Sequence, residues 1–499
     1  MVFIHKIKKG KYTYLAKVEN KWVNGKVVQK HLGYVGKEIS GKQIRSGTLE
    51  NTNVTKVSIW APLLVLDTLA KQIHLAELLG DKGEYLLSMV YAHCIDPKSV
   101  HRMEEWYQRT DLHSMLHIQD ISEQKLYNAL DSIDERDYTL IQKKIFRAVT
   151  EKYHLKPKGL FFDVTNVYFY GTECAIAKKG HSKEGGYRPQ VQIGLAVTKQ
   201  EGIPIFHKTY EGNIFDARTL QEFLIGFQEL NIEDVTIIWD RGITSAENIG
   251  DAKKAGYEVI CGLAIKQDVK KKVDELLQTK SEIQLLKNRV RLKETILYCT
   301  KQPYTYGNSK GQLVLCFNEE QARINKETRL DRINNAQMLL RKKKPIPEEI
   351  QEYLHTNGSL NEAAITTAQQ YDGYSVLFST KDLPTEEIVK PYFEKDKVEK
   401  AFRSLKSVLG LKPIKHWLEE RVKAHIFICY ISYLLLSLLE HKLQKINVTA
   451  IMALDKLSTS YKVHLKNKKT NIEFTKTVTL SQEQQKIIKA IDKNIIIKT

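Results

Sequence analysis

The sequence predicts an α/β fold in which a core sheet is interrupted by an inserted mixed α/β domain and is preceded by a basic β module and a helical domain. Two observations lead to this prediction. The runs at 160–165, 191–197 and 235–239 are rich in apolar residues, which is typical of strands buried on both faces of a sheet. The stretch between Asp240 and Glu399 is far longer than an ordinary connection between elements, which indicates an insertion.

Residues 1–55 are predicted to form the basic β module. Residues 12–18 and 26–29 have strand character, and Asn24-Gly25 between them is a typical hairpin turn. Residues 1–48 carry 11 Lys and Arg against two acids, Glu19 and Glu38. Such a basic and aromatic composition favours a DNA-binding module. The alternative is a basic hairpin that only packs on the rest of the chain.

Residues 56–157 are predicted to form the helical domain. Between Leu63 and Leu79, apolar residues recur at steps of three and four, and Gly80 is a plausible end of that helix. No helix-turn-helix is predicted in this region.

Residues 158–265 are predicted to form the first part of the core. Asp163 lies inside an apolar strand, where a carboxylate is costly unless a cation meets it. Asp240 ends another apolar strand, and the carboxyl ends of strands are where open α/β sheets bind ligands. Either aspartate alone could be a surface residue. Together on neighbouring strands they favour a divalent metal site, because hard cations prefer carboxylate oxygens.

Residues 266–372 are predicted to form the insertion domain, and residues 373–440 the second part of the core. The insertion shows strands near 290–293 and 312–315 and a long helix that Asn318 caps. Residues 374–378 read as a strand that returns the chain to the core sheet, which leaves the insertion as a separate lobe. The apolar stretch 424–439 is shorter than the roughly 20 residues of a membrane span, so a buried helix is expected and no membrane partner.

A charged segment near the end of the core has the spacing Y-(2)-K-(3)-E-(6)-K, formed by Tyr392, Lys395, Glu399 and Lys406. On one continuous helix this spacing places all four side chains on a single face. That face would present one metal-binding carboxylate beside two cations and a phenol. The alternative is a solvated charged helix with a Lys395–Glu399 pair.

In this order, the strand aspartate, the strand-end Asp240-Arg241-Gly242 and the charged segment resemble bacterial and archaeal insertion-sequence transposases of the DDE type. Their helical signature is Y-(2)-R-(3)-E-(6)-K, and Lys395 stands here in place of the arginine, which keeps the charge but loses bidentate phosphate recognition. The likeness extends over roughly residues 158–440 and includes these further stretches: Pro189-Gln190-Val191, Gly212-Asn213, residues 411–414 and residues 422–426.

The resemblance implies a ribonuclease H-like catalytic core in which Asp163, Asp240 and Glu399 are the catalytic and metal-binding residues. It implies two Mg²⁺ ions per active site, with Mn²⁺ as the expected substitute. The expected DNA contacts are Tyr392, Lys395, Arg403 and Lys406. Asp216 is the main rival for an acidic ligand, but it follows a Gly-Asn turn and is interpreted as structural.

The implied activity is that of a DNA transposase, an endonuclease and strand transferase that cleaves the ends of a mobile element and joins the 3′ ends to target DNA. The implied partner is double-stranded DNA, bound by a homodimer. No nucleotide cofactor is implied, and nothing in the sequence resembles a P-loop. Two alternatives remain: a catalytically inactive, transposase-derived DNA-binding protein, and a structure-specific nuclease on the same core.

The charge distribution adds a prediction about both ends of the chain. The net charge is +18, and residues 441–499, a basic C-terminal region, carry 12 Lys against 4 acids. With the basic N-terminal end this accounts for nearly all of the excess, so most non-specific DNA affinity is expected there. The alternative is that the lysines only solubilise the C-terminal region. The six scattered cysteines and the lack of an evident signal peptide favour a cytoplasmic protein associated with chromosomal DNA.

Overall fold

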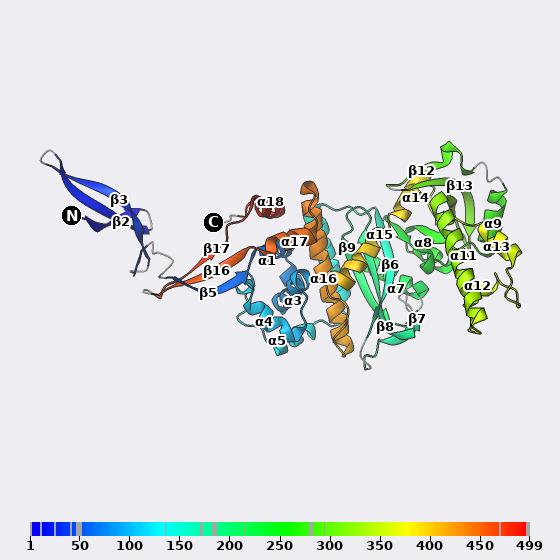
Figure 1. Ribbon diagram of the computed structural model, residues 1–499, viewed down its shortest axis with the longest axis horizontal. Coiled ribbons are helices and arrows are strands. Elements are labelled where there is room, and N and C mark those ends of the chain that lie inside the picture. Colours follow the sequence, from blue (N-terminus) through cyan, green and yellow to red (C-terminus); the bar gives the residue numbers. More distant parts are fainter. Residues whose placement is uncertain are drawn as a thin grey trace. The chain divides into compact units, whose positions relative to one another are not determined.

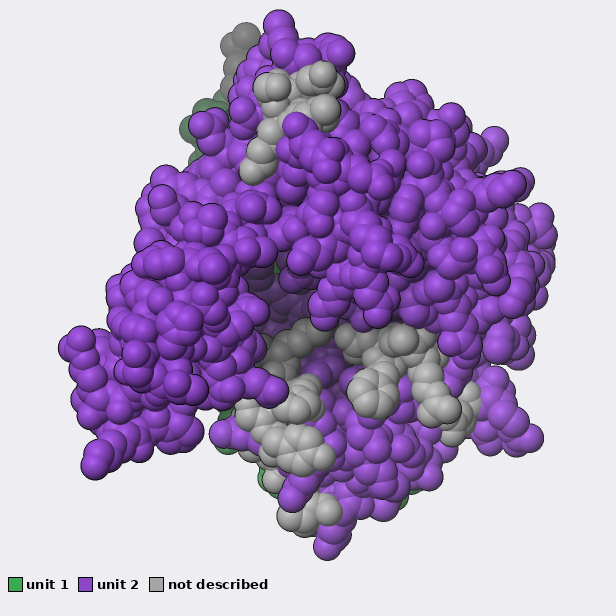
Figure 2. All heavy atoms as spheres, turned by 90° about the vertical axis from the view of Figure 1, so that its right-hand side faces the viewer, with its two compact units in different colours: residues 1–129, 438–499 green, residues 130–437 purple. Residues whose placement is uncertain are grey.

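The computed structural model describes residues 2–9, 12–23, 26–39, 42–45, 52–134, 136–169, 173–181, 187–214, 216–278, 283–293, 295–468 and 471–495. The chain divides into two compact units, which Figure 2 shows in different colours. Unit 1 comprises residues 1–129 and 438–499, and unit 2 comprises residues 130–437. Each unit is described by itself.

Unit 1 begins with an antiparallel sheet of four described strands in chain order. They are β1 (Val2–Lys9), β2 (Tyr12–Val23), β3 (Lys26–Ile39) and β4 (Lys42–Arg45). Leu15, Ala16 and Val18 of β2 are buried, whereas Tyr12, Trp22 and Tyr34 are more than half exposed. The β character predicted for this module is therefore present, and the turn predicted at Asn24-Gly25 lies outside the described residues.

The helices of unit 1 follow β5 (Thr52–Ile59), and Figure 1 labels most of them. They are α1 (Ala61–Gln72), α2 (Leu75–Leu78), α3 (Gly83–Ile95), α4 (Met103–Gln108) and α5 (Glu123–Leu130), with short 3-10 turns at Val100–Arg102 and Leu112–Ser114. The single helix expected between Leu63 and Leu79 is wrong, because His74 takes a left-handed conformation with φ 53° that separates α1 from α2. Gly80, with φ 86°, follows the end of α2 as expected.

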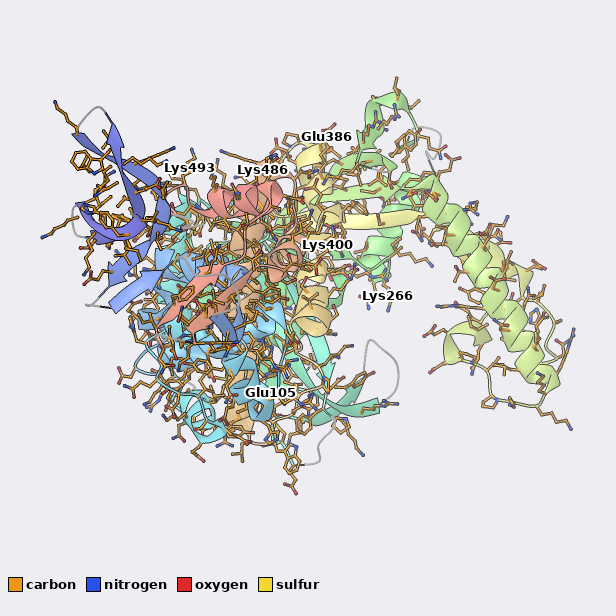
Figure 3. All side chains as sticks on the ribbon, turned by 60° about the vertical axis from the view of Figure 1, so that its left-hand side comes forward. Glu105, Lys266, Glu386, Lys400, Lys486 and Lys493 are labelled. Atoms are coloured by element: carbon orange, nitrogen blue, oxygen red, sulfur yellow. The ribbon has the colours of Figure 1, made fainter. Side chains whose placement is uncertain are left out.

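The C-terminal region is folded into unit 1. It contains a 3-10 turn (Gln444–Ile446), α17 (Ala450–Ser458), β16 (Tyr461–Asn467), β17 (Glu473–Thr477) and α18 (Gln482–Ile491). β16 pairs with β5 and with β17 in one antiparallel sheet, and α1 packs against α17 and α18. Apolar residues such as Leu457 and Ile488 are fully buried there. This region is therefore part of the core of unit 1, although several of its lysines, such as Lys486 and Lys493 labelled in Figure 3, are exposed.

One ion pair ties β16 to the helical part of unit 1. The Lys462 ammonium lies 2.8 Å from the carboxylate of Asp111, whose side chain is fully buried. We expect Lys462→Met to lower the free energy of unfolding by about 3 kcal/mol, because it leaves a buried carboxylate without its cation. Lys466→Met is the matched control on the same strand, since Lys466 pairs with the exposed Glu473 and should cost well under about 1 kcal/mol. If urea unfolding shows that the two variants lose equal amounts of unfolding free energy, this prediction is contradicted.

Unit 2 is built on a large mixed sheet, with ten described strands. Its order is β12 (Arg289–Arg291), β13 (Ile296–Tyr306), β14 (Ser309–Phe317), β15 (Tyr374–Ser379), β11 (Glu258–Leu263), β10 (Thr236–Trp239), β6 (Gly159–Tyr168), β8 (Tyr187–Thr198) and β7 (Lys178–His181), with β9 (Pro204–Glu211) also paired to β8. The strands predicted at 160–165, 191–197, 235–239 and 374–378 are all present. β6 runs parallel to β10, and β10 runs parallel to β11.

Helices cover one face of this sheet with a continuous apolar core. Leu160, Phe162 and Val164 of β6 pack in that core with residues of α7 (Asp216–Glu229), α8 (Ala246–Lys254) and α9 (Gln267–Leu277). Because side chains alternate along a strand, Phe161, Asp163 and Thr165 point to the opposite face. Unit 2 also contains α6 (Asp137–Tyr153).

The insertion does not form a separate lobe, contrary to the prediction. Its strands β12, β13 and β14 continue the core sheet, because β14 pairs with β15 along six residues. Three of its helices have a small core of their own, centred on Ile333 and Ile350. These are α11 (Glu319–Arg341), α12 (Glu348–Gln351) and α13 (Glu362–Gln369). The Asn318 side chain accepts a hydrogen bond from the N–H of Gln321, which is the predicted cap of α11.

The charged segment 392–406 is not the single helix that was predicted. α14 (Thr385–Phe393) ends before Glu394, α15 (Asp396–Arg403) begins after Lys395, and a π-helical turn (Ser404–Val408) follows. If α14 continued without a break, Lys395 and Asp396 would lie one helical turn after Tyr392, on the face of α14 that is buried. Because the helix is interrupted, α15 turns a different set of residues toward the protein interior, and Val398 and Phe402 are buried.

The apolar stretch 424–439 lies in α16 (Glu419–Leu443), as expected for a helix. Together with the turn that follows, it is the one helix among the described residues that is long and apolar enough to cross a membrane. Within that helix, 89% of the apolar window is buried inside the protein. Burial of this kind is what a core helix shows.

Candidate functional site

Asp163 and Asp240 lie on neighbouring parallel strands. Phe162 of β6 is the register partner of Trp239 of β10, so the two aspartates are the next residues along each strand. Asp240 continues β10 with an extended backbone, at φ −82° and ψ 160°. Neighbouring strands lie about 4.8 Å apart. The sequence positions of the two aspartates therefore translate directly into spatial neighbours.

Both aspartates point to the face of the sheet that carries α14 and α15. Ile237 and Trp239 of β10 belong to the core on the other face, so Ile238 and Asp240 face away from it. α14 packs against β10 and β11, and α15 packs against β6 and β8. The helix that bears Glu399 therefore lies on the same face as the two aspartates.

Three donors surround one oxygen of Asp240. Its Oδ1 lies 2.8 Å from the backbone nitrogen of Arg241 and 2.9 Å from the Tyr392 hydroxyl. The Lys395 ammonium lies 2.7 Å from the same oxygen. Burial acts to raise the pKa of Asp240, but the hydrogen bond and charge of Lys395, with help from Arg241 and Tyr392, hold it below its ordinary value. Asp240 is therefore an anion at neutral pH, and its side chain is 47% exposed.

The start of α15 is anchored at two points. Lys395 reaches Asp240, and Lys397 donates to the backbone carbonyls of Lys199 and Gln200, at 2.5 Å and 2.8 Å. Glu399 follows on the exposed side of this helix. Lys397 is a structural anchor that the sequence did not reveal, because a lysine in a charged helix usually remains in solvent.

The other expected DNA contacts lie beyond Glu399. Arg403, at the end of α15, is exposed, and Lys406 is partly buried within the π-helical turn. The single face predicted for Tyr392, Lys395, Glu399 and Lys406 is wrong in detail, because these residues belong to two α-helices, the junction between them and a π turn. The side chain of Asp216, the rival acid, lies outside the described residues.

The donor types fit a hard divalent cation. Asp163, Asp240 and Glu399 supply carboxylate oxygens from two adjacent strands and from a helix on the same face, and Asp240 is open to solvent. Among the described residues, the ligand oxygens of all three do not lie within 4.8 Å of one another. A cation at Asp240 would lie beside the Lys395 ammonium, which pairs with Oδ1.

A glycine makes room for the Tyr392 hydroxyl. A Cβ atom at Gly262 of β11 would lie 2.3 Å from Tyr392 Oη and 3.2 Å from the Arg241 Cβ. Any larger residue at position 262 would therefore push the phenol away from Asp240. Sequence reasoning missed Gly262, since one glycine inside an apolar strand carries no signal of its own.

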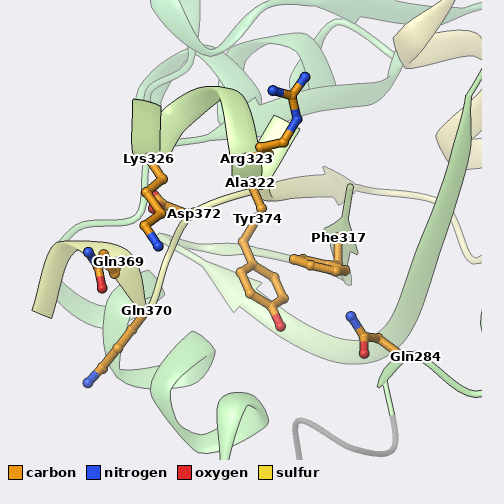
Figure 4. A pocket seen from close by; sticks show the side chains of 9 residues that line it. All are labelled: Gln284, Phe317, Ala322, Arg323, Lys326, Gln369, Gln370, Asp372 and Tyr374. Atoms are coloured by element: carbon orange, nitrogen blue, oxygen red, sulfur yellow. The ribbon is translucent and has the colours of Figure 1, made fainter. Parts of the chain in front are cut away.

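One cavity of unit 2 has a different lining. It has a volume of about 560 Å³ and lies among the insertion helices and the start of β15, where Phe317, Tyr374, Arg323 and Lys326 are among its lining residues (Figure 4). None of the expected site residues lines it.

Comparison with known proteins gives one family. The family described as "Transposase DDE domain" matches residues 154–435 of the chain. No curated protein matches the sequence. Among solved structures, the chain is similar to a piggyBac transposase synaptic complex with hairpin DNA, at 11% identity and a TM-score of 0.38, over 80% of this chain and 79% of that one. It is also similar to a Mos1 transposase paired-end complex with the left transposon end, at 12% identity and a TM-score of 0.15, over 35% of this chain and 57% of that one.

Proposed function

The chain belongs to the DDE transposase family, and from this premise we propose that it cleaves the ends of a mobile DNA element and joins the 3′ ends to target DNA. The observation that carries the proposal is the register of β6 and β10, which makes Asp163 and Asp240 neighbours on the sheet face that also holds the Glu399 helix. We propose that these three residues are the catalytic carboxylates of a ribonuclease H-like core.

The role of each side chain follows from its surroundings. Asp163 and Asp240 give the site its negative charge, and Asp240 is kept ionised by Lys395. Bound Mg²⁺, or Mn²⁺ in its place, as two ions per site, would lower the pKa of the attacking water or 3′-hydroxyl and stabilise the leaving oxygen. Lys395, Arg403 and Lys406 would neutralise DNA phosphates beside the carboxylates.

The basic surface of unit 1 supplies the DNA-binding area of the proposal. The β1–β4 sheet exposes Tyr12, Trp22 and Tyr34 together with lysines such as Lys8 and Lys30, and α18 exposes further lysines. Lysines bind phosphates without regard to sequence, and exposed aromatic rings add apolar contact. We propose that double-stranded DNA lies on this surface, that the protein works as a homodimer on DNA, and that it acts on chromosomal DNA in the cytoplasm.

The experiment that tests the proposal uses the full chain and a labelled DNA fragment that carries the sequence flanking its gene. With Mg²⁺ or Mn²⁺ we expect nicks that leave 3′-hydroxyl ends at the element boundary, and joined products when target DNA is added. With EDTA we expect binding without either product. A fragment of scrambled boundary sequence is the control. Cleavage that persists in EDTA, or that is equal on the scrambled fragment, would contradict the proposal.

A further inference from the structure

Tyr392 is held in a position where it can act on Asp240. Its side chain is 7% exposed, and its hydroxyl donates to Asp240 Oδ1 at 2.9 Å. The Lys395 ammonium lies 4.5 Å from the centre of the Tyr392 ring and pairs with the same carboxylate. Gly262 leaves the space that the hydroxyl occupies, with no room for a Cβ atom.

The direction of these contacts is informative. The Arg241 N–H, the Tyr392 hydroxyl and the Lys395 ammonium all meet Oδ1. Oδ2 is therefore the oxygen that remains for a cation. A carboxylate whose second oxygen is fixed by hydrogen bonds loses less freedom when it binds a metal, and such partners typically change metal affinity by 10–100-fold.

We propose that Tyr392 is a positioning residue that acts through Asp240: it fixes Oδ1 so that Oδ2 is presented to a divalent cation. The resemblance implies that Tyr392 contacts DNA. The geometry favours the carboxylate, because a phenol has one proton to donate and Tyr392 gives it to Asp240. The inference rests on the proposed function in one respect, namely that Asp240 is a metal ligand.

The direct test measures Mn²⁺ binding to the full chain without DNA, by electron paramagnetic resonance of the free ion. Tyr392→Phe removes only the hydroxyl, and we expect it to weaken Mn²⁺ binding about 10-fold. DNA binding measured in EDTA should remain unchanged. Tyr371→Phe is the matched control, since the Tyr371 hydroxyl donates to Asp274 at 2.5 Å in a similar pair elsewhere in unit 2. That control should leave Mn²⁺ affinity as it is.

A second variant approaches the same hydrogen bond from the other side. Gly262→Ala places a methyl group against Tyr392 Oη, and we expect it to reproduce the loss of Mn²⁺ affinity while Tyr392 itself is intact. Circular dichroism confirms that each variant is folded. If both variants bind Mn²⁺ as the unchanged protein does, or if Tyr392→Phe loses DNA binding instead, the inference is wrong.

The outcomes also separate this inference from the proposed function. Mn²⁺ binding that depends on Tyr392, in a protein that never cleaves DNA, would sustain the positioning role and reject the transposase activity. If the Tyr392→Phe variant cleaves DNA with unchanged metal dependence, the transposase activity is sustained and the positioning role of Tyr392 is rejected. Failure of the unchanged protein to bind Mn²⁺ at millimolar concentration would reject both.

Discussion

Strand cleavage by Asp240→Asn is expected to be roughly 10³-fold slower than by the unchanged protein, which corresponds to about 4 kcal/mol of lost transition-state stabilisation. The substitution keeps the shape of the side chain and removes its charge. An amide is a much weaker ligand for a hard cation than a carboxylate, and it cannot form the ion pair that Lys395 makes with Asp240. The measurement is single-turnover cleavage of a labelled element end in Mg²⁺.

Binding to the same DNA end should change far less, because the lysines and aromatic residues of unit 1 are untouched by this substitution. Asp268→Asn is the matched control: its side chain is 83% exposed, and it pairs with Lys271 at the start of α9. That variant should cleave at the normal rate. Comparable losses in the two variants would show that the effect is not specific to the proposed site.

Truncation of the chain after Ile446 is expected to abolish the cooperative unfolding of unit 1. It removes β16, which pairs with β5, and the helices α17 and α18, which cover α1. Part of the buried apolar surface of α1 would lose its cover, and burial of each apolar side chain contributes about 1.5–3 kcal/mol. Circular dichroism, thermal unfolding and limited proteolysis of the truncated protein measure this loss.

A variant of unchanged length separates charge from folding. Lys476, Lys486, Lys489 and Lys493 are exposed, so changing all four to Gln should leave unit 1 folded. If these lysines bind DNA phosphates, the slope of log K against log salt should become shallower by about 0.9 for each phosphate that is no longer neutralised, up to roughly 3.6. A normal slope in this variant would show that these lysines only solubilise the surface.

A truncated protein with normal cooperative unfolding would contradict the assignment of this region to the core.

The strands of the core could be predicted well, and the helix phase and the sheet partners could not. Apolar runs mark strands such as those of Phe162 and Ile238 because burial on both faces is a local property of the chain. The break between α14 and α15 depends on which face of each helix is buried, which only the neighbouring strands decide. Local periodicity therefore placed Tyr392, Lys395 and Glu399 on one helix that does not exist as a single element.

Pairing across long distances in the sequence was also out of reach. β5 and β16 are joined by contacts between residues about 400 positions apart, such as that from Thr55 to His464. A strand pattern gives no indication of its partner. The same limit applied to the site residues. Asp163 and Asp240 could be predicted from the sequence because each interrupts an apolar strand. Gly262 and Lys397 could not, since their importance lies only in what they touch.

The placement of β15 between β11 and β14 has a consequence for the order in which unit 2 can assemble. β11 and β14 are made earlier in synthesis, with the insertion helices still to come between β14 and β15. Val376 and Leu377 join both neighbours at once, so the ladder cannot be closed until those helices have emerged. Until then, two strand edges are open to pairing with other chains. The sheet of unit 2 is thus completed by a late strand with distant partners, an arrangement of high contact order that is typical of slow folding.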